Sequence, residues 1–270
     1  MFADPKYLSR GKDSTVQQLS FKKDGKKISI VCKSMRAENF NSEVNKLVGH
    51  NHPQLEKILH IWHYNLGNVV VLFCEQIEKT LNKVKIESFE HELSIAQQVL
   101  SGLEYLHLNL ELAHCDLKEN NIMADAEGKR VKIIDFNNCM PKKAFGRFEL
   151  GVVLAKKHMD LLVNPKNWDW KVDFWALGCT IFQVKHKADI LDEFLKQSNV
   201  DYATLDNSKY NDQHQKTRIC LYNFYLRKIK QFKQTEQIVY ACLKSSSCSM
   251  LAQYFERIRD FHQLPAPAEC

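Results

Sequence analysis

A long apolar helical pattern followed by a short polar loop constrains the fold of this chain more than any other feature. Between Phe89 and Leu108 the apolar residues recur at helical spacing, at Leu93, Ala96, Val99, Leu100, Leu103 and Leu106. The next segment, Ala113–Met123, reads AHCDLKENNIM and carries Asp116, Lys118 and Asn121 close together. The chain must therefore bury a long helix in a core and hold this polar loop at the end of that helix.

The three polar side chains of this loop suit the transfer of a phosphoryl group. The carboxylate of Asp116 can accept the proton of an attacking hydroxyl, and the ammonium of Lys118 can neutralise charge on the transferred group. The amide oxygen of Asn121 is a ligand type that Mg²⁺ binds. A solvated turn has a similar composition, so the rest of the chain must decide between the two interpretations.

The composition is that of a folded globular protein. The 270 residues are 44% hydrophobic and 26% charged, and no run of about 18 apolar residues predicts a membrane span. Nine cysteines are scattered without a C-x-x-C pair, which predicts reduced thiols and neither a disulfide framework nor a zinc site. We expect an intracellular protein, cytoplasmic or nuclear, with no membrane partner.

The net charge of +6 is modest for this length, so we expect no direct binding of nucleic acid. One group of basic residues lies within an aromatic-rich stretch and consists of Lys216, Arg218, Arg227, Lys228, Lys230 and Lys233. A solvated helix face and a docking surface for an acidic partner both fit this pattern.

The first third of the chain predicts an antiparallel sheet. Tyr7–Leu8, Val16–Leu19 and Ile28–Cys32 are β-rich, and Asp24-Gly25 between the last two is a strong hairpin signal. Val69–Phe73 is an apolar run typical of a buried strand. The polar stretch that follows predicts a boundary between a small lobe, residues 1–77, and a larger helical lobe, residues 78–270.

A lysine and a glutamate stand out within the first lobe. Lys33 ends the strand pattern ISIVCK, and Glu43 opens a helical pattern with Val44, Leu47 and Val48 on one face. A strand lysine and a helix glutamate can pair across a sheet. A surface lysine and a solvent-facing glutamate would produce the same pattern.

The segment after the polar loop predicts two short strands, Ile122–Met123 and Val131–Ile134, around a turn at Gly128. Asp135 follows the second strand, where its carboxylate is either a metal ligand or a turn residue. Residues 136–172 lack clear periodicity, an apolar helix follows from Asp173, and residues 189–262 are predicted helical with polar breaks near Asn199 and Ser245.

Taken in order, the segments VCK, Glu43, HCDLKENN, DFN and VDFWALG resemble the eukaryotic protein kinase family over nearly the whole chain. The resemblance implies an α+β, bilobal protein-kinase-like fold. Its small β-rich N-lobe would hold a five-stranded sheet and a regulatory helix, and its larger C-lobe would be mainly α-helical. It also implies transfer of the γ-phosphate of ATP to a protein substrate, with Mg²⁺, or Mn²⁺ in its place, as cofactor.

The resemblance implies a chemical role for each matched polar residue. Lys33 would bind the α- and β-phosphates of ATP and pair with Glu43. Asp116 would be the catalytic base, and Lys118 would lie beside the γ-phosphate. The implied Mg²⁺ ligands are Asn121 and Asp135.

The resemblance also implies which residues surround the nucleotide and which connect the lobes. Val16, Val31 and Met123 would sandwich adenine, Gly11 would lie in the phosphate-covering loop, and Cys74 would close the back of the pocket, while the backbone of Glu75 and Ile77 would bind adenine. The implied internal spine consists of His114, Phe136, Leu47 and Ile58. Asp173 would tie the catalytic loop to the central helix.

Several positions depart from the family pattern. Only Gly11 keeps a glycine in the phosphate-covering loop, where Ser9 and Ser14 take the other places. Cys115 replaces an arginine, so a phosphorylated activation segment would lack its main cationic partner, and we expect activity that is independent of such a phosphate. Asn137 replaces the glycine after Asp-Phe, which predicts a turn with less freedom to flip.

Two further departures concern segments around the site. Only ten positions separate Lys33 from Glu43, so the placement of the Glu43 helix would depend on an activating partner or a homodimer. His158-Met159-Asp160 stands where the family has Ala-Pro-Glu, and Asp160 would pair with Arg257 or Arg259. Such a trimmed chain resembles the kinases of large DNA viruses, including baculoviruses.

Three functions fit these residues. Lys118 favours a serine/threonine protein kinase, because related antibiotic and choline kinases usually lack a lysine at that place. A pseudokinase-like scaffold that binds partners without turnover fits the depleted glycine loop and the short link to Glu43. A small-molecule phosphotransferase on the same scaffold is the third hypothesis.

Overall fold

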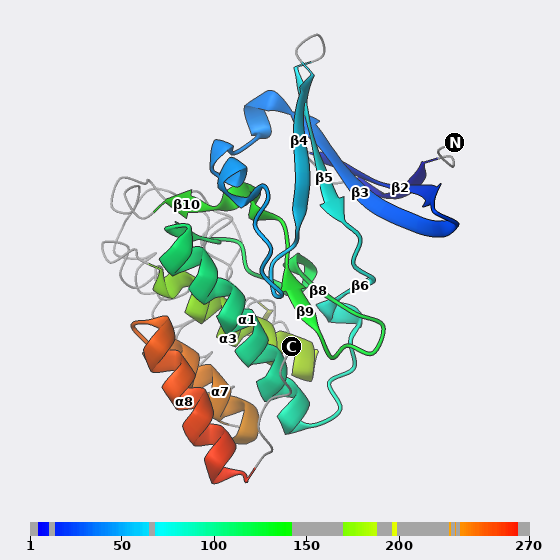
Figure 1. Cartoon of the computed structure of the whole chain (residues 1–270). Helices are drawn as coiled ribbons and strands as arrows, with labels where there is room; N and C mark the ends of the chain where they lie inside the picture. Colours follow the sequence, from blue (N-terminus) through cyan, green and yellow to red (C-terminus); the bar gives the residue numbers. More distant parts are fainter. Residues whose placement is uncertain are drawn as a thin grey trace.

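The computed structural model describes residues 5–10, 14–64, 68–141, 170–187, 196–198, 227, 230 and 233–263. A sheet and a group of helices form two lobes that meet near β8 and β9 (Figure 1). The five strands of the sheet are antiparallel and run in the order β1-β2-β3-β5-β4. Their bounds are Lys6–Arg10, Ser14–Lys23, Lys26–Arg36, Ile58–Tyr64 and Val69–Glu75 for β1 to β5.

The hairpin between β2 and β3 forms where the sequence predicts it. Asp24 and Gly25 both have positive φ angles, 50° and 74°, as the turns that match the twist of paired strands require. This register places Val16 opposite Lys33, and β5 in turn pairs Cys74 with Val31. The sequence did not locate β4, in which only Ile58 is buried.

The segment that carries Glu43 forms 3-10 helices, η1 (Ala37–Asn39) and η2 (Ser42–Leu47). In this geometry residues three apart lie on one face, so Val44 and Leu47 are buried at 1% and 2% exposure while Val48 is 37% exposed. The prediction that Val48 shares this face is therefore wrong, and the helix predicted from Glu43 is a 3-10 segment. The Asn41 side chain caps η2 by accepting the Glu43 N–H at 3.0 Å.

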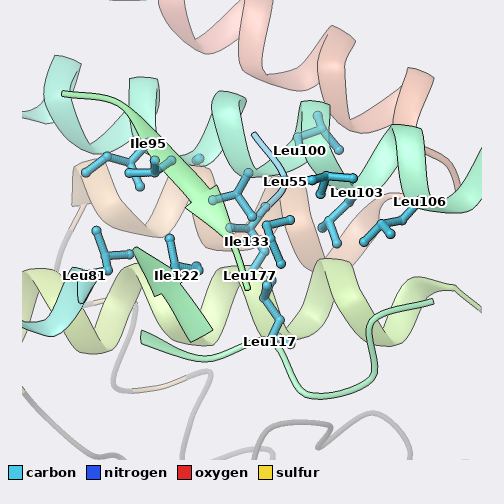
Figure 2. Close-up of a cluster of buried hydrophobic side chains, with 14 of the residues drawn as sticks. Leu55, Leu81, Ile95, Leu100, Leu103, Leu106, Leu117, Ile122, Ile133 and Leu177 are labelled. Carbon is cyan, nitrogen blue, oxygen red and sulfur yellow. The ribbon is translucent and has the colours of Figure 1, made fainter. Parts of the chain in front are cut away.

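The C-lobe is built around α1, Phe89–Asn109, which packs against α3 (Lys171–His186), α7 (Lys233–Lys244) and α8 (Cys248–Phe261). Ser88 caps α1 by accepting the His91 N–H at 3.1 Å. Leu103 of α1, Ile133 of β9 and Leu177 of α3 lie in one buried cluster (Figure 2). None of the described helices is both long and apolar enough to span a bilayer.

Short strands place the polar loop between the two lobes. β8 (Ile122–Ala124) lies between β6 (Lys79–Thr80) and β9 (Val131–Ile133), and β7 (Leu112–Ala113) pairs with β10 (Met140–Pro141). Gly128, between β8 and β9, has a φ of 77°, as predicted for that turn. Together with the sheet and helices, these strands confirm the bilobal α+β fold.

One backbone connection links the segment before β4 to the C-lobe strands. Ile133 N–H donates to the Gln54 carbonyl at 2.8 Å, and Glu56 N–H donates to the Ile133 carbonyl at 2.8 Å. The predictions for Gly11 and Asp160, and for Lys216, Arg218 and Lys228 of the basic group, lie outside the described residues.

Candidate active site

A buried aspartate of α3 fixes the backbone of the polar loop. Asp173 accepts the His114 N–H at 2.7 Å and the Cys115 N–H at 2.9 Å, and it is 2.8 Å from the His107 Nε2. Burial would raise the pKa of Asp173, but the bond to His107 and the positive potential of His107 and His114 hold that pKa below its usual value. The predicted tie between the loop and the central helix is confirmed.

The residue in the place of the family arginine is enclosed. Cys115 is 1% exposed and has a φ of 60°, and burial together with Asp173 raises the pKa of its thiol. The thiol is therefore neutral near neutral pH. A neutral, buried side chain offers no charge to a phosphate, which agrees with the expectation drawn from the sequence.

The structure brings Asp116, Lys118 and Asn121 together on one carboxylate oxygen. Lys118 Nζ lies 2.6 Å and Asn121 Nδ2 lies 3.0 Å from Asp116 Oδ2. Asn138 Nδ2 donates to the same oxygen at 3.3 Å. In the described part of the chain no donor bonds to Oδ1 of Asp116, so that oxygen is the one suited to accept a substrate proton.

Asn138 was not identified from the sequence. The only signal was its place directly after the DFN segment, and its contact with Asp116 spans 22 positions along the chain.

Asn121 presents the atom that a metal needs. Its Nδ2 donates to the Asp116 carbonyl at 2.8 Å as well as to the carboxylate, so its Oδ1 is the acceptor end of the amide. Its own backbone is fixed by Asn121 N–H donating to Lys118 O at 2.8 Å and by Ile134 N–H donating to Asn121 O at 2.9 Å. The side chain is thus held before a metal arrives.

Lys33 of β3 pairs with Asp135, which follows β9. Glu43 instead pairs with Lys46, one turn along η2, at 2.7 Å. Within the described residues no ion pair joins Lys33 to Glu43, so the implied pairing of those two residues is corrected. The 3-10 geometry of η2 and the cap on the Glu43 N–H direct the side chain along its own segment.

The charge state of Asp135 suits metal binding. Burial would raise its pKa, but the nearby Lys33 ammonium, with smaller effects of His114 and Lys118, holds that pKa below its usual value. The residue has a left-handed backbone with a φ of 63°. An ionised carboxylate is the form that Mg²⁺ binds.

A second glutamate near Lys33 was missed in the sequence. Burial raises the pKa of Glu56 to about 7, and the nearby Lys33 ammonium and Asp135 N–H lower it in part. Burial, together with the nearby Glu56 carboxylate, raises the pKa of the Cys74 thiol. The available signal was a charged residue inside the apolar pattern Leu55–Leu59.

The residues implied around adenine come from both lobes. Val16 and Val31 lie on β2 and β3, each partly buried, and Met123 lies on β8. Glu75 N–H donates to Lys57 O at 3.0 Å, so that N–H already has a partner within the protein. The nucleotide-binding roles of these residues, of Ile77 and of Cys74 stay predictions.

Two residues of the implied internal spine, His114 and Phe136, are in direct contact. The rings of His114 and Phe136 meet edge to face with centroids 5.6 Å apart. Leu47 and Ile58 are 2% and 1% exposed. Val48, next to Leu47, forms a parallel β-bridge with Ile58. The contact between His114 and Phe136 joins the polar loop to the turn that follows Asp135.

The donor set fits Mg²⁺ delivered with a nucleotide. Asn121 Oδ1 and the Asp135 carboxylate are oxygen ligands, and Mg²⁺ commonly takes one or two protein oxygens and completes its shell with phosphates and water. In the described residues no three His, Cys, Asp or Glu side chains gather into a metal-binding cluster. The site is therefore suited to share a cation with phosphate oxygens.

The structure has a five-stranded sheet over a helical lobe. A lysine–aspartate pair and an aspartate-bearing loop lie between the two lobes. Together these features define the class of phosphoryl-transferring kinase folds. The family pattern described as "Protein kinase domain" matches residues 4–253, and the chain belongs to the protein kinase family.

Individual relatives agree with this assignment. A probable serine/threonine-protein kinase, an MRK1 homolog of Encephalitozoon cuniculi, is 26% identical over 56% of this chain and 49% of its own length. A putative serine/threonine-protein kinase, L670 of Acanthamoeba polyphaga mimivirus, is 29% identical over 66% of this chain and 31% of its own length. A cyclin-dependent kinase, C-3 of rice, is 31% identical over 42% of this chain and 35% of its own length. The chain thus spans about half or less of the relatives that it matches.

Proposed function

We propose that this chain is an active serine/threonine protein kinase that uses Mg-ATP. The observation that carries the proposal is the arrangement around Asp116. One carboxylate oxygen takes the Lys118 and Asn121 bonds, and the other, to which no described residue donates, is suited to take the proton of a hydroxyl substrate.

The residues divide the chemistry as follows. Asp116 orients the acceptor hydroxyl and takes its proton, and Lys118 neutralises charge on the transferred phosphoryl group. Lys33 binds phosphate oxygens of ATP, which requires that it exchange its bond to Asp135 for one to the nucleotide. Asn121 and Asp135 would hold Mg²⁺. That cation, when bound, neutralises charge between the phosphates.

Two observations support protein hydroxyls of serine and threonine as acceptors. Lys118 occupies the position at which serine/threonine kinases carry a lysine. Relatives from a microsporidian and a giant virus are named serine/threonine-protein kinases. That an activating partner or a second copy binds at the Glu43 segment stays a prediction.

A scaffold without turnover is the second candidate, and the Glu43–Lys46 pair favours it, because Lys33 then lacks the glutamate that the family uses. A small-molecule phosphotransferase is the third candidate. A scaffold without turnover would not require the bonds on Asp116, so these bonds favour an enzyme.

The test compares the wild type with Asp116→Asn in phosphate transfer from Mg-ATP to serine, threonine and tyrosine peptides. Loss of a general base commonly lowers kcat by about 10²–10⁴-fold, and we expect a loss in that range. Glu127→Gln, in the exposed turn between β8 and β9, is the matched control and should keep full activity.

Equal transfer by the wild type and Asp116→Asn would refute the enzyme proposal. Transfer to an amino alcohol or an aminoglycoside, with none to any peptide, would show that the acceptor is a small molecule.

A further inference from the structure

Two asparagines join the N-lobe segment before η2 to the turn that follows Asp135. Asn41 precedes η2, and Asn137 lies in η6, Phe136–Asn138. The 3-10 segments lie beside the chain that leads into β10 (Figure 1). The two residues are 96 positions apart, so their contact connects distant parts of the fold.

Each of the two side chains uses both ends of its amide. The Asn41 N–H donates to Asn137 Oδ1 at 3.0 Å, and Asn137 Nδ2 donates to the Asn39 carbonyl at 2.6 Å. Asn41 Nδ2 donates to the Cys139 carbonyl at 2.7 Å, while its Oδ1 accepts the Glu43 N–H at 3.0 Å. We call this set of bonds the asparagine latch.

The latch holds the chain directly after one residue pair. Asp135 and Phe136 lie directly before Asn137, and Phe136 is only 2% exposed. A rotation of this turn that carried Asp135 away from Lys33 would break the two Asn137 bonds. An amide suits these two bonds, because it places a donor nitrogen and an acceptor oxygen on one short side chain.

We propose that Asn137 and Asn41 are positioning residues that hold Asp135 in its metal-binding place, in the absence of a Lys33–Glu43 ion pair. This inference rests on the proposed function. In this proposal the latch tethers the two lobes at this site. It also keeps the Asp-Phe turn in a single conformation before nucleotide binds.

The proposal predicts a specific kinetic change. In a two-state equilibrium the apparent Kd of a ligand rises as the competent fraction falls. Asn137→Gly, which restores the family residue, should therefore raise the KM for Mg-ATP about tenfold and leave kcat and the peptide KM nearly unchanged. Such a rise means that the competent fraction falls from about nine-tenths to about one-tenth, a hundredfold shift of the equilibrium that equals about 2.8 kcal/mol, the upper range for two neutral hydrogen bonds.

Three further variants sharpen the test. Asn137→Asp keeps the acceptor oxygen and the shape but loses the bond to the Asn39 carbonyl, so it should raise the KM for Mg-ATP in the same direction as Asn137→Gly. Asn41→Ala should act in the same direction, and its combination with Asn137→Gly should cost less than the product of the two effects. Asn45→Ala, on the exposed side of η2, should match the wild type.

Hydrogen exchange provides a readout that does not depend on activity. Amides of residues 133–141 should exchange about tenfold faster in Asn137→Gly, while those of α1 keep their rates, since the latch holds a local segment. Unchanged exchange in 133–141 would overturn the proposal. Faster exchange in α1 as well, or a fall in kcat at constant KM, would overturn it too, because both indicate general loss of folded protein.

If the wild type transfers no phosphate, the proposed function fails, and exchange in residues 133–141 still decides whether the latch exists.

Discussion

At the scale of single residues, the charge that neutralises Lys33 decides how this site works. Lys33 pairs with Asp135, and Glu43 forms an ion pair with Lys46 within its own segment. The Glu43 and Lys46 side chains are 26% and 46% exposed, and such partly exposed pairs contribute little to stability. Lys33 is thus positioned from the C-lobe side of the site.

This arrangement predicts unequal effects of two substitutions. Glu43→Gln should keep kcat/KM within about threefold of the wild type, since an exposed pair of this kind is worth at most about 1 kcal/mol. Lys33→Met should lower kcat/KM by about 10²–10³-fold, as expected for loss of a preorganised charge at the transferred group. Steady-state kinetics with a peptide substrate measures both. A loss in Glu43→Gln as large as that in Lys33→Met would show that Glu43 reaches Lys33 during turnover.

At the scale of elements, α1 approaches the segment before β4 closely enough to require a glycine. A Cβ at Gly102 would lie 3.0 Å from the Gln54 carbonyl oxygen and 3.0 Å from the Ile133 Cδ1. The Gln54 carbonyl also accepts the Ile133 N–H. The helix, the N-lobe segment and β9 therefore meet at one point.

Gly102→Ala should destabilise the protein even though alanine favours helices. Crowding a packed site costs about 1–3 kcal/mol, and the helix propensity of alanine returns up to about 1 kcal/mol, so we expect a net loss of about 1–2 kcal/mol. Denaturant unfolding measures it, with Ser101→Ala in the same turn of α1 as the control. A more stable Gly102→Ala would show that α1 can move away from the Gln54 carbonyl.

At the scale of the whole molecule, a buried glutamate of α1 makes stability depend on pH. Burial raises the pKa of Glu92 from 4.5 to about 7, and Thr235 and Lys185 offset only part of the rise. Between these two values the folded state holds a proton that the unfolded state has released. Stability therefore falls as the pH rises through this window.

Glu92→Gln should remove much of this dependence. A shift of this size corresponds to roughly 3 kcal/mol, and the variant should be more stable than the wild type near pH 8 by about 1–3 kcal/mol. Thermal melts from about pH 5 to about pH 8 test this expectation, with the exposed Glu90→Gln as control. Glu56 titrates in the same range, so some dependence remains. Parallel pH curves for the wild type and Glu92→Gln would refute the assignment.

The sequence by itself determined the features that near neighbours in the chain create. Asp24 and Gly25 specify a hairpin, the apolar spacing after Phe89 specifies α1, and the spacing of Asp116 and Asn121 places both in one loop. The order of these motifs along the chain was enough to predict the bilobal fold. Turn chemistry and helical periodicity act over a few residues, so they can be read without knowledge of the tertiary structure.

Only the tertiary structure decided which groups meet at the site. Lys33 and Asp135 are 102 positions apart, and Asn41 and Asn137 are 96 positions apart. Whether Lys33 contacts Glu43 or Asp135 depends on the 3-10 geometry of η2. That geometry follows from the burial of Val44 and Leu47 against the rest of the fold, because a six-residue segment does not hold a helix by propensity alone.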